Sequence, residues 1–151
     1  MAEPSETPVS SPQGTSPEEV VARLMARDAF SQLMGMEVID AGPGRAVVRM
    51  PVRSDMVNGF GTLHGGALFS LADSAFAFAT NGAGTLSVAI DMHLGIPTAS
   101  FPGDVLTATA VEQSTTNRLS FVDVTVLNQK DVVVGHFRGT VYRTHKPHVF
   151  D

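Results

Sequence analysis

The chain has 151 residues, of which 43% are hydrophobic and 17% charged, a length and balance typical of one domain with a substantial core. Its formal net charge of −5 argues against a broad nucleic-acid interface, and the lack of cysteine excludes a thiol nucleophile, disulfide bonds and thiolate metal sites. No stretch is long and apolar enough to be a transmembrane helix. We therefore predict a cytoplasmic protein that binds neither nucleic acid nor membranes.

Both ends of the chain are predicted to lie outside the folded domain. Residues 1–15 are rich in proline, serine and acidic side chains and lack the basic start and apolar core of a signal peptide, so we expect a disordered tail. Ser16-Pro17-Glu18-Glu19 then has the pattern of a capping box with proline at the first helical position, and an irregular apolar stripe carries this helix to about Met34. We expect a single domain over residues 16–146, followed by a C-terminal tail over 147–151.

After Gly35 the apolar period changes from that of a helix to the two-residue period of a strand. Strands are predicted over residues 36–41, 45–52, 86–94, 105–113, 119–127 and 132–142. Between the second and third strands, residues 67–81 are small and apolar on nearly every side, which predicts a buried helix of about four turns. Short turns between long strands imply antiparallel pairing, so we predict an α+β fold in which one antiparallel sheet wraps around the central helix.

One charged residue, Asp73, lies inside this apolar helix. Its neighbours one turn away are apolar apart from a serine: Phe69, Ser70, Phe76 and Ala77. An ionised carboxylate in such surroundings is costly unless it has a partner. Either Asp73 is a structural residue that pairs with an arginine or caps a loop, or it is a catalytic carboxylate whose pKa is set by its surroundings. We favour the catalytic role.

Gly65 lies at the start of the same helix, where free backbone N–H groups and the helix dipole favour negative charge. A glycine there lets the backbone approach a carbonyl closely, although Gly65-Gly66 could also serve only to pack the loop. Gly65 and Asp73 are eight residues apart, so about 12 Å apart along the helix axis, whereas catalytic contacts run to roughly 3 Å. If both act on one substrate, the carboxylate must come from a second copy of the chain, with two antiparallel central helices facing each other.

A longer pattern surrounds these two residues. Residues 58–81 read N-G-F-G-T-L-H-G-G-A-L-F-S-L-A-D-S-A-F-A-F-A-T-N, and G-D-V-L-T-A-T-A from Gly103 and H-F-R-G-T-V-Y-R from His136 follow. Over roughly Phe30 to Arg143, the sequence resembles the hotdog-fold acyl-CoA thioesterases, most closely the PaaI-type thioesterases of phenylacetate degradation. The resemblance implies a hotdog fold, in which an antiparallel sheet wraps a long helix, and homodimers that commonly pair into tetramers.

The resemblance also implies roles for named residues. Asp73 is the implied catalytic carboxylate, and the Gly65 N–H polarises the thioester carbonyl of a ring-hydroxylated phenylacetyl-CoA. The sequence leaves open whether Asp73 attacks the carbonyl directly or activates water as a general base. No metal is expected, and no cofactor beyond the coenzyme A that forms part of the substrate.

Two further residues of the motif have more than one interpretation. Asn58 could orient the water or hold the Asp73 carboxylate, or it could simply form the turn before Gly59. His64 could line the oxyanion site or be a hydrogen-bonded structural residue. Additional substrate-binding candidates are Phe60, Gly66, Ser74, Arg138 and Arg143, the two arginines as contacts for the coenzyme A phosphates.

One segment departs from the family pattern. Gly95-Ile96-Pro97 stands where many relatives have Arg-Pro, so the usual phosphate contacts and acyl pocket are not expected to carry over unchanged. The alternatives to an aromatic thioesterase are an enzyme for medium-chain or other acyl-CoAs, a hotdog hydratase, or a non-catalytic acyl-CoA-binding protein. Asp91 and His93 share a strand face as metal ligands might, but no third ligand is evident, so a solvated face is favoured.

Overall fold

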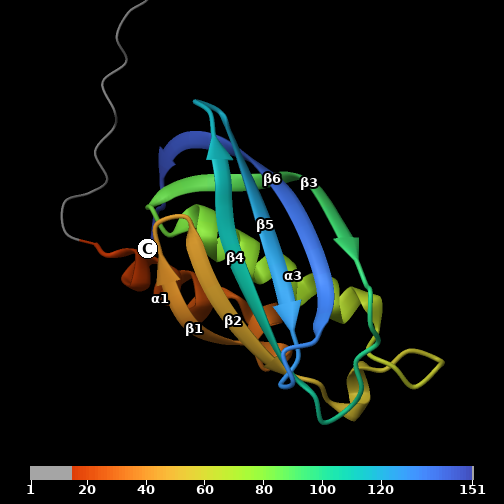
Figure 1. Cartoon of the computed structure of the whole chain (residues 1–151). Helices are drawn as coiled ribbons and strands as arrows, with labels where there is room; N and C mark the ends of the chain where they lie inside the picture. The colour runs from red at the N-terminus through yellow and green to blue at the C-terminus, as the bar shows by residue number, and fades with distance from the viewer. Residues whose placement is uncertain (1–14, 151) are drawn as a thin grey trace, which may run out of the picture.

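The computed structural model describes residues 15–150, so the predicted N-terminal tail lies outside the described residues except for Thr15. The helices are α1 (Pro17–Arg27), α2 (Ala29–Leu33) and α3 (Gly65–Asn81), with a short 3-10 turn at Ser54–Met56. The strands are β1 (Glu37–Gly42), β2 (Arg45–Pro51), β3 (Thr85–Gly95), β4 (Val105–Thr115), β5 (Leu119–Leu127) and β6 (Val133–Pro147). They form one sheet in the order β1-β2-β4-β5-β6-β3, antiparallel throughout, which curves around α3 (Figure 1). The predicted α+β fold is confirmed.

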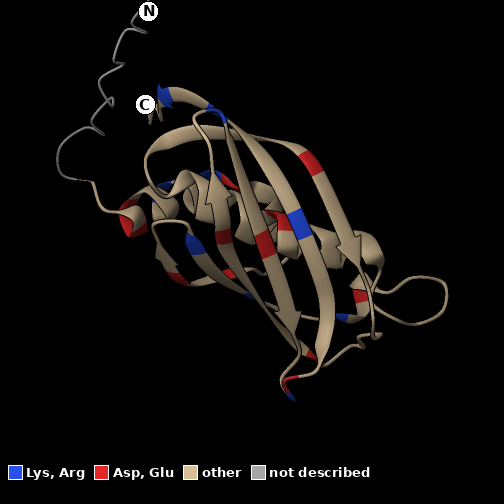
Figure 2. Ribbon diagram, turned by 45° about the horizontal axis from the view of Figure 1, so that its top comes forward, with Lys and Arg blue, Asp and Glu red and all other residues tan. Residues whose placement is uncertain are grey.

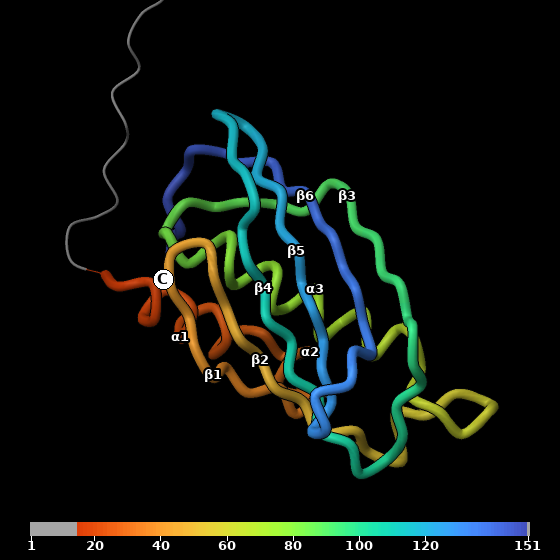
Figure 3. The backbone as a smooth tube through the Cα atoms, in the orientation of Figure 1, coloured from red at the N-terminus to blue at the C-terminus, as the bar shows by residue number. Residues whose placement is uncertain are grey.

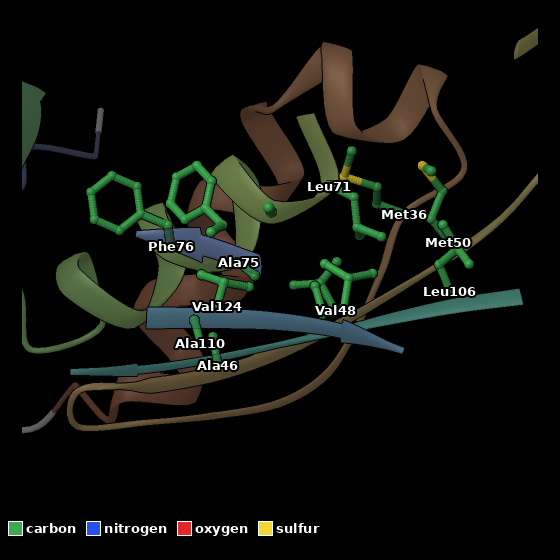
Figure 4. Packing of buried hydrophobic residues seen from close by; sticks show 14 of the residues in the cluster. Met36, Ala46, Val48, Met50, Leu71, Ala75, Phe76, Leu106, Ala110 and Val124 are labelled. Carbon is green, nitrogen blue, oxygen red and sulfur yellow. The ribbon is translucent and has the colours of Figure 1, made fainter. Parts of the chain in front are cut away.

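The helix α3 supplies the centre of the hydrophobic core. Leu71, Ala75 and Phe76 are fully buried, and they lie against side chains of the sheet such as Val48 and Val124 (Figure 4). This burial, rather than helix propensity, is what holds a helix of small residues in place. None of the helices in residues 15–150 is long and apolar enough to cross a membrane.

The packing of α3 on β6 depends on a glycine beneath an aromatic cluster. The Phe76 ring lies 5.4 Å from the Phe137 ring of β6, and Phe137 in turn lies 5.6 Å from Phe69, measured between centroids. A Cβ at Gly139 would lie 2.6 Å from Cζ of Phe76, closer than side-chain contacts allow. Gly139 therefore lets the sheet approach the helix closely enough to bury Phe76 completely.

The predicted helix from Ser16 to Met34 is wrong in one respect, because the chain forms two helices. The capping box at Ser16 is present, with the Glu19 N–H donating to Ser16 Oγ at 3.3 Å. At Asp28, however, the first helix ends and a second begins, since the Asp28 carboxylate accepts the Ser31 N–H at 2.9 Å. A short polar side chain that bonds the backbone in this way competes with continuation of the helix. The tube in Figure 3 shows the resulting change of direction between α1 and α2.

The edge strand β3 contains a bulge between Ala89 and Asp91. Before the bulge, Val88 pairs with Tyr142 on the exposed outer face of the sheet; after it, Met92 packs against the core. A regular strand would put its alternating apolar residues on one face throughout, whereas the extra residue moves them from one face to the other. The outer face of β3 is consequently apolar at one end and charged at the other.

The C-terminal residues pack against the start of the domain. The strand β6 ends at Pro147, one residue beyond the predicted domain boundary, and the His148 N–H donates to the Gly84 carbonyl at 3.2 Å. The Arg23 guanidinium of α1 lies 5.5 Å from the centroid of the Phe150 ring. Residues 148–150 thus cover one side of α1, at the end of the molecule opposite the loop before α3 (Figure 1).

Candidate active site

The loop that precedes α3 projects from the molecule (Figure 1). Hydrogen bonds of the Asn58 side chain hold its conformation. Asn58 Oδ1 accepts the Phe60 N–H at 2.9 Å, and its Nδ2 donates to Thr62 Oγ1 at 3.0 Å. The amide is thereby used within the loop, as the turn-forming interpretation of Asn58 requires. Phe60 lies in the same loop, and 93% of its surface is exposed to solvent.

His64 caps the N-terminus of α3 with its side chain. Its Nδ1 accepts the Gly66 N–H at 2.9 Å, which assigns the ring proton to Nε2. A Cβ at Gly66 would lie 3.0 Å from that Nδ1, so the glycine makes room for the imidazole cap. His64 is therefore a helix cap, and its Nε2–H takes no part in the cap bond.

The Gly65 N–H is the free donor at this helix end. Among the described residues it donates no hydrogen bond, whereas the Ala67 N–H bonds to the His64 carbonyl. It points out of the positive end of a 17-residue helix, a site that favours a developing negative charge. The Ile96 side chain lies alongside, with Cδ1 at 3.4 Å from where a Cβ of Gly65 would be. The segment that departs from the family pattern thus borders the candidate oxyanion site.

Asp73 lies on the one open face of α3. Gly66, Ser70, Asp73 and Ala77 follow one another at helical spacing; Gly66 is exposed and the other three are partly exposed, while most other positions of the helix are buried. Burial raises the pKa of the Asp73 carboxyl above its ordinary value, and the nearby Asp28 carboxylate adds to the effect. Within the described chain, Asp73 has no ion-pair partner, so its structural role as the partner of an arginine is not observed.

A hydrogen-bonded chain that the sequence did not predict lies beside Asp73. Asp28 Oδ2 accepts the Ser31 hydroxyl at 2.6 Å, and Ser31 Oγ lies 2.8 Å from Ser74 Oγ. Because the Ser31 proton is directed to Asp28, Ser74 is the donor in the second bond. Ser74, predicted to contact substrate, is in this structure bonded to α2. The Asp-x-x-Ser pattern is a helix N-cap signal, which could have located α2 but not its contact with α3.

The two arginines lie away from the N-terminus of α3 within the same subunit. Arg138 is on the outer face of the sheet, where its Nε and Nη2 donate to the two carboxylate oxygens of Asp123 at 2.6 and 2.9 Å. Figure 2 shows charged residues of both signs on the strands of the sheet as well as on the helices. Arg143 Nη1 donates to the Thr116 carbonyl of the β4–β5 hairpin at 2.9 Å. The fold therefore brings together residues 58–66 but does not add Arg138 or Arg143 to them.

The Asp91–His93 pair on β3 is a contact on the protein surface. His93 Nε2 lies 3.3 Å from Asp91 Oδ2, and both side chains are more than half exposed. Within residues 15–150, no three His, Asp or Glu side chains are grouped so that they could hold a metal ion.

Comparison with known proteins identifies the family. Residues 60–134 match the model of the Thioesterase superfamily. The acyl-coenzyme A thioesterase PaaI of Escherichia coli (strain K12) is 40% identical over 120 residues, which are 80% of this chain and 86% of that protein. The structure of the E. coli PaaI protein matches with a TM-score of 0.85 at 34% identity, over 89% of this chain and 96% of that one. A Streptococcus pneumoniae hypothetical thioesterase with coenzyme A matches with a TM-score of 0.78 at 25% identity, over 83% and 98%.

Fold, motif and relatives define one class of protein: a thioester hydrolase with the hotdog fold. The chain belongs to the thioesterase superfamily. Within it, the similarity to E. coli PaaI over most of both chains assigns the chain to the PaaI type, so the predicted family is confirmed.

Proposed function

We propose that this protein hydrolyses CoA thioesters of phenylacetate-like aromatic acids, ring-hydroxylated ones included, to the free acid and coenzyme A. The observation that carries the proposal is the free Gly65 N–H at the end of α3 together with the half-buried Asp73 on its open face. The relatives' names, acyl-coenzyme A thioesterase and a protein of the phenylacetic acid degradation operon, support the substrate class. The cysteine-free sequence supports a cytoplasmic location.

The site is proposed to form between two subunits. Gly65 and Asp73 are on one continuous helix, about 12 Å apart along its axis, so one carbonyl cannot contact both in the same chain. Two features support a dimer that solves this. The strand β3 pairs only with β6 among the described strands, which leaves a free edge for a second copy, and α3 has an open face. The exposed apolar residues Leu86 and Val88 on the outer face of β3 support further pairing of dimers into a tetramer.

The proposed chemistry uses Asp73 of one subunit and Gly65 of the other. As a general base, the carboxylate takes a proton from water while the water oxygen attacks the carbonyl; the coenzyme A thiolate then leaves as the tetrahedral intermediate collapses. As a nucleophile, the carboxylate attacks directly, the thiolate leaves, and water hydrolyses the resulting mixed anhydride. In both cases the Gly65 N–H stabilises the oxyanion, and the raised pKa of Asp73 makes it a stronger base.

The test is release of free thiol from a panel of thioesters: phenylacetyl-, 3,4-dihydroxyphenylacetyl-, 4-hydroxybenzoyl-, acetyl-, hexanoyl- and palmitoyl-CoA. We expect the highest kcat/KM for the phenylacetyl esters. Preference for hexanoyl- or palmitoyl-CoA would retain the hydrolase and reject the aromatic substrate. Tight binding of CoA esters with no thiol release would instead favour a non-catalytic acyl-CoA-binding protein.

A further inference from the structure

A hollow of about 380 Å³ lies between α2 and the first two turns of α3. One wall consists of Phe30, Leu33 and Met34, and the opposite wall includes His64, Gly66 and Ser70. A volume of this size lies within the range of small-molecule sites. His64 and Gly66, the residues on either side of Gly65, both line the hollow, so it lies next to the end of α3 that carries the proposed oxyanion donor.

The α2 wall presents large apolar side chains to solvent. Phe30 is 54% exposed and Leu33 is 69% exposed, although Ser31 between them is fully buried. A five-residue helix has little stability of its own, so its position here depends on the bonds from Ser31 to Asp28 and Ser74. The buried serine fixes the helix against α3 and thereby holds the two apolar side chains over the hollow. Exposed apolar groups on such a fixed support indicate a binding surface.

The chemistry of the hollow fits an acyl group better than the nucleotide part of coenzyme A. Met56, Val57 and Ala67 add to its apolar lining. Its one cation, Arg53, is paired with Asp55 at 3.0 Å, so no uncompensated positive charge is available for a phosphate. The Ser70 hydroxyl donates to the Gly66 carbonyl at 2.7 Å, which leaves its oxygen able to accept a hydrogen bond from a ring hydroxyl.

We propose that this hollow binds the acyl group of the substrate and that Phe30 and Leu33 determine its specificity. The inference rests on the proposed function, since a carbonyl placed at the Gly65 N–H directs its acyl substituent to the adjoining hollow. An aromatic ring packs against Phe30 and the two methionines, Met34 and Met56, contacts that favour aromatic over short acyl groups. The coenzyme A part extends away from α2.

The test separates the acyl contribution to binding from that of coenzyme A. We would measure the Kd of free coenzyme A and of its S-(2-phenylethyl) thioether, which cannot be hydrolysed, for wild type, Phe30→Ala and Leu33→Ala. The matched control is Val149→Ala, an exposed apolar residue at the other end of the molecule. In wild type we expect the thioether to bind more tightly than coenzyme A. In each α2 variant the ratio of the Kd of coenzyme A to the Kd of the thioether is expected to fall roughly three- to tenfold, while the Kd of coenzyme A stays the same.

Three outcomes would overturn the proposal: an equal loss for coenzyme A and the thioether, no loss for either, or dissociation of the subunits by Phe30→Ala with the difference unchanged. If Phe30→Ala does not fold, Phe30→Leu serves instead, with an expected fall in kcat/KM for phenylacetyl-CoA relative to hexanoyl-CoA. Failure of the proposed hydrolase activity gives a different result, because wild type would then release no thiol while the difference in binding is retained.

Discussion

The two faces of α3 have opposite chemistry. The face toward the sheet carries Leu71, Ala75 and Phe76, which are fully buried. The open face carries Gly66, Ser70 and Asp73, a set that contributes little to the core and includes a carboxyl group whose pKa is raised by burial. One helix thus supplies stability from one side and the proposed reactive groups from the other. Substitutions on the two faces should therefore separate stability from activity.

The largest effect is expected at Asp73. Asp73→Asn keeps the shape but not the base, so kcat should fall by roughly 10²–10⁴-fold, the usual contribution of a general base. Thiol release from phenylacetyl-CoA measures it. The control is Asp131→Asn, an exposed residue with φ 59° in the β5–β6 turn, where asparagine is tolerated. Retention of near-wild-type rate by Asp73→Asn would reject the catalytic assignment.

The same variant should be more stable than wild type at neutral pH. Folding raises the pKa of Asp73 above its unfolded value, so the folded state favours the protonated carboxyl. The stabilisation that this preference gives the folded state is fully present below the pKa of Asp73 in the unfolded chain. It is lost as pH rises through the pKa of Asp73 in the folded protein. Asparagine avoids this loss, so the Tm of the variant should exceed that of wild type at pH 7 and approach it in acid.

The buried face is tested by Gly139→Ala. The new Cβ would collide with the Phe76 ring, and overpacking of this kind costs about 1–3 kcal/mol of the free energy of unfolding. Urea unfolding measures the loss, and the rate per folded enzyme should be retained. Gly95→Ala is the control, because its Cβ would have no neighbour closer than 3.8 Å. Equal stability of the two variants would contradict the account of this packing.

A smaller effect is expected at the cap of α3. His64→Ala removes the acceptor of the Gly66 N–H and should cost about 1 kcal/mol, as the loss of other N-caps does. His64→Asn retains an acceptor and should recover most of that free energy of unfolding. Equal losses in the two variants would show that the cap bond is not what stabilises this end of the helix.

The smallest effect concerns pH. In the proposed mechanism hydrolysis needs the ionised Asp73, so the rate should fall as pH drops through its raised pKa. Asp28→Asn removes a neighbouring negative charge while keeping an oxygen to cap α2. The acid limb of kcat/KM should then move to lower pH. An unchanged limb would mean that Asp28 acts only through structure.

The sequence predicted the parts that depend on local pattern. The apolar run after Gly65 predicted α3, and the alternation of the strands predicted the sheet around it. The positions of Gly65 and Asp73 on one helix also predict a site shared by two subunits. Each of these follows from spacing along the chain.

What the sequence did not predict depends on contacts between distant segments. The bond from Ser31 to Ser74 joins residues 43 positions apart, and the contact of Ile96 with Gly65 depends on how the β3–β4 connection returns to α3. The bulge after Ala89 was missed because an alternating pattern looks regular whether or not a residue is inserted. The hollow proposed to bind the acyl group depends on the placement of α2, which rests on the first of these contacts.

The site between subunits can be tested by mixing two inactive variants. Gly65→Pro removes the N–H at the first position of α3, where proline fits and where the extended His64 backbone accepts a following proline. Gly65→Ala, which keeps the N–H, is its control.

In a mixed dimer of Gly65→Pro and Asp73→Asn, one site has both defects and the other has neither. Random mixing after co-refolding should therefore restore about a quarter of the wild-type rate per subunit. If well-mixed dimers stay inactive, Gly65 and Asp73 of different subunits do not form one active site, which would contradict the shared site.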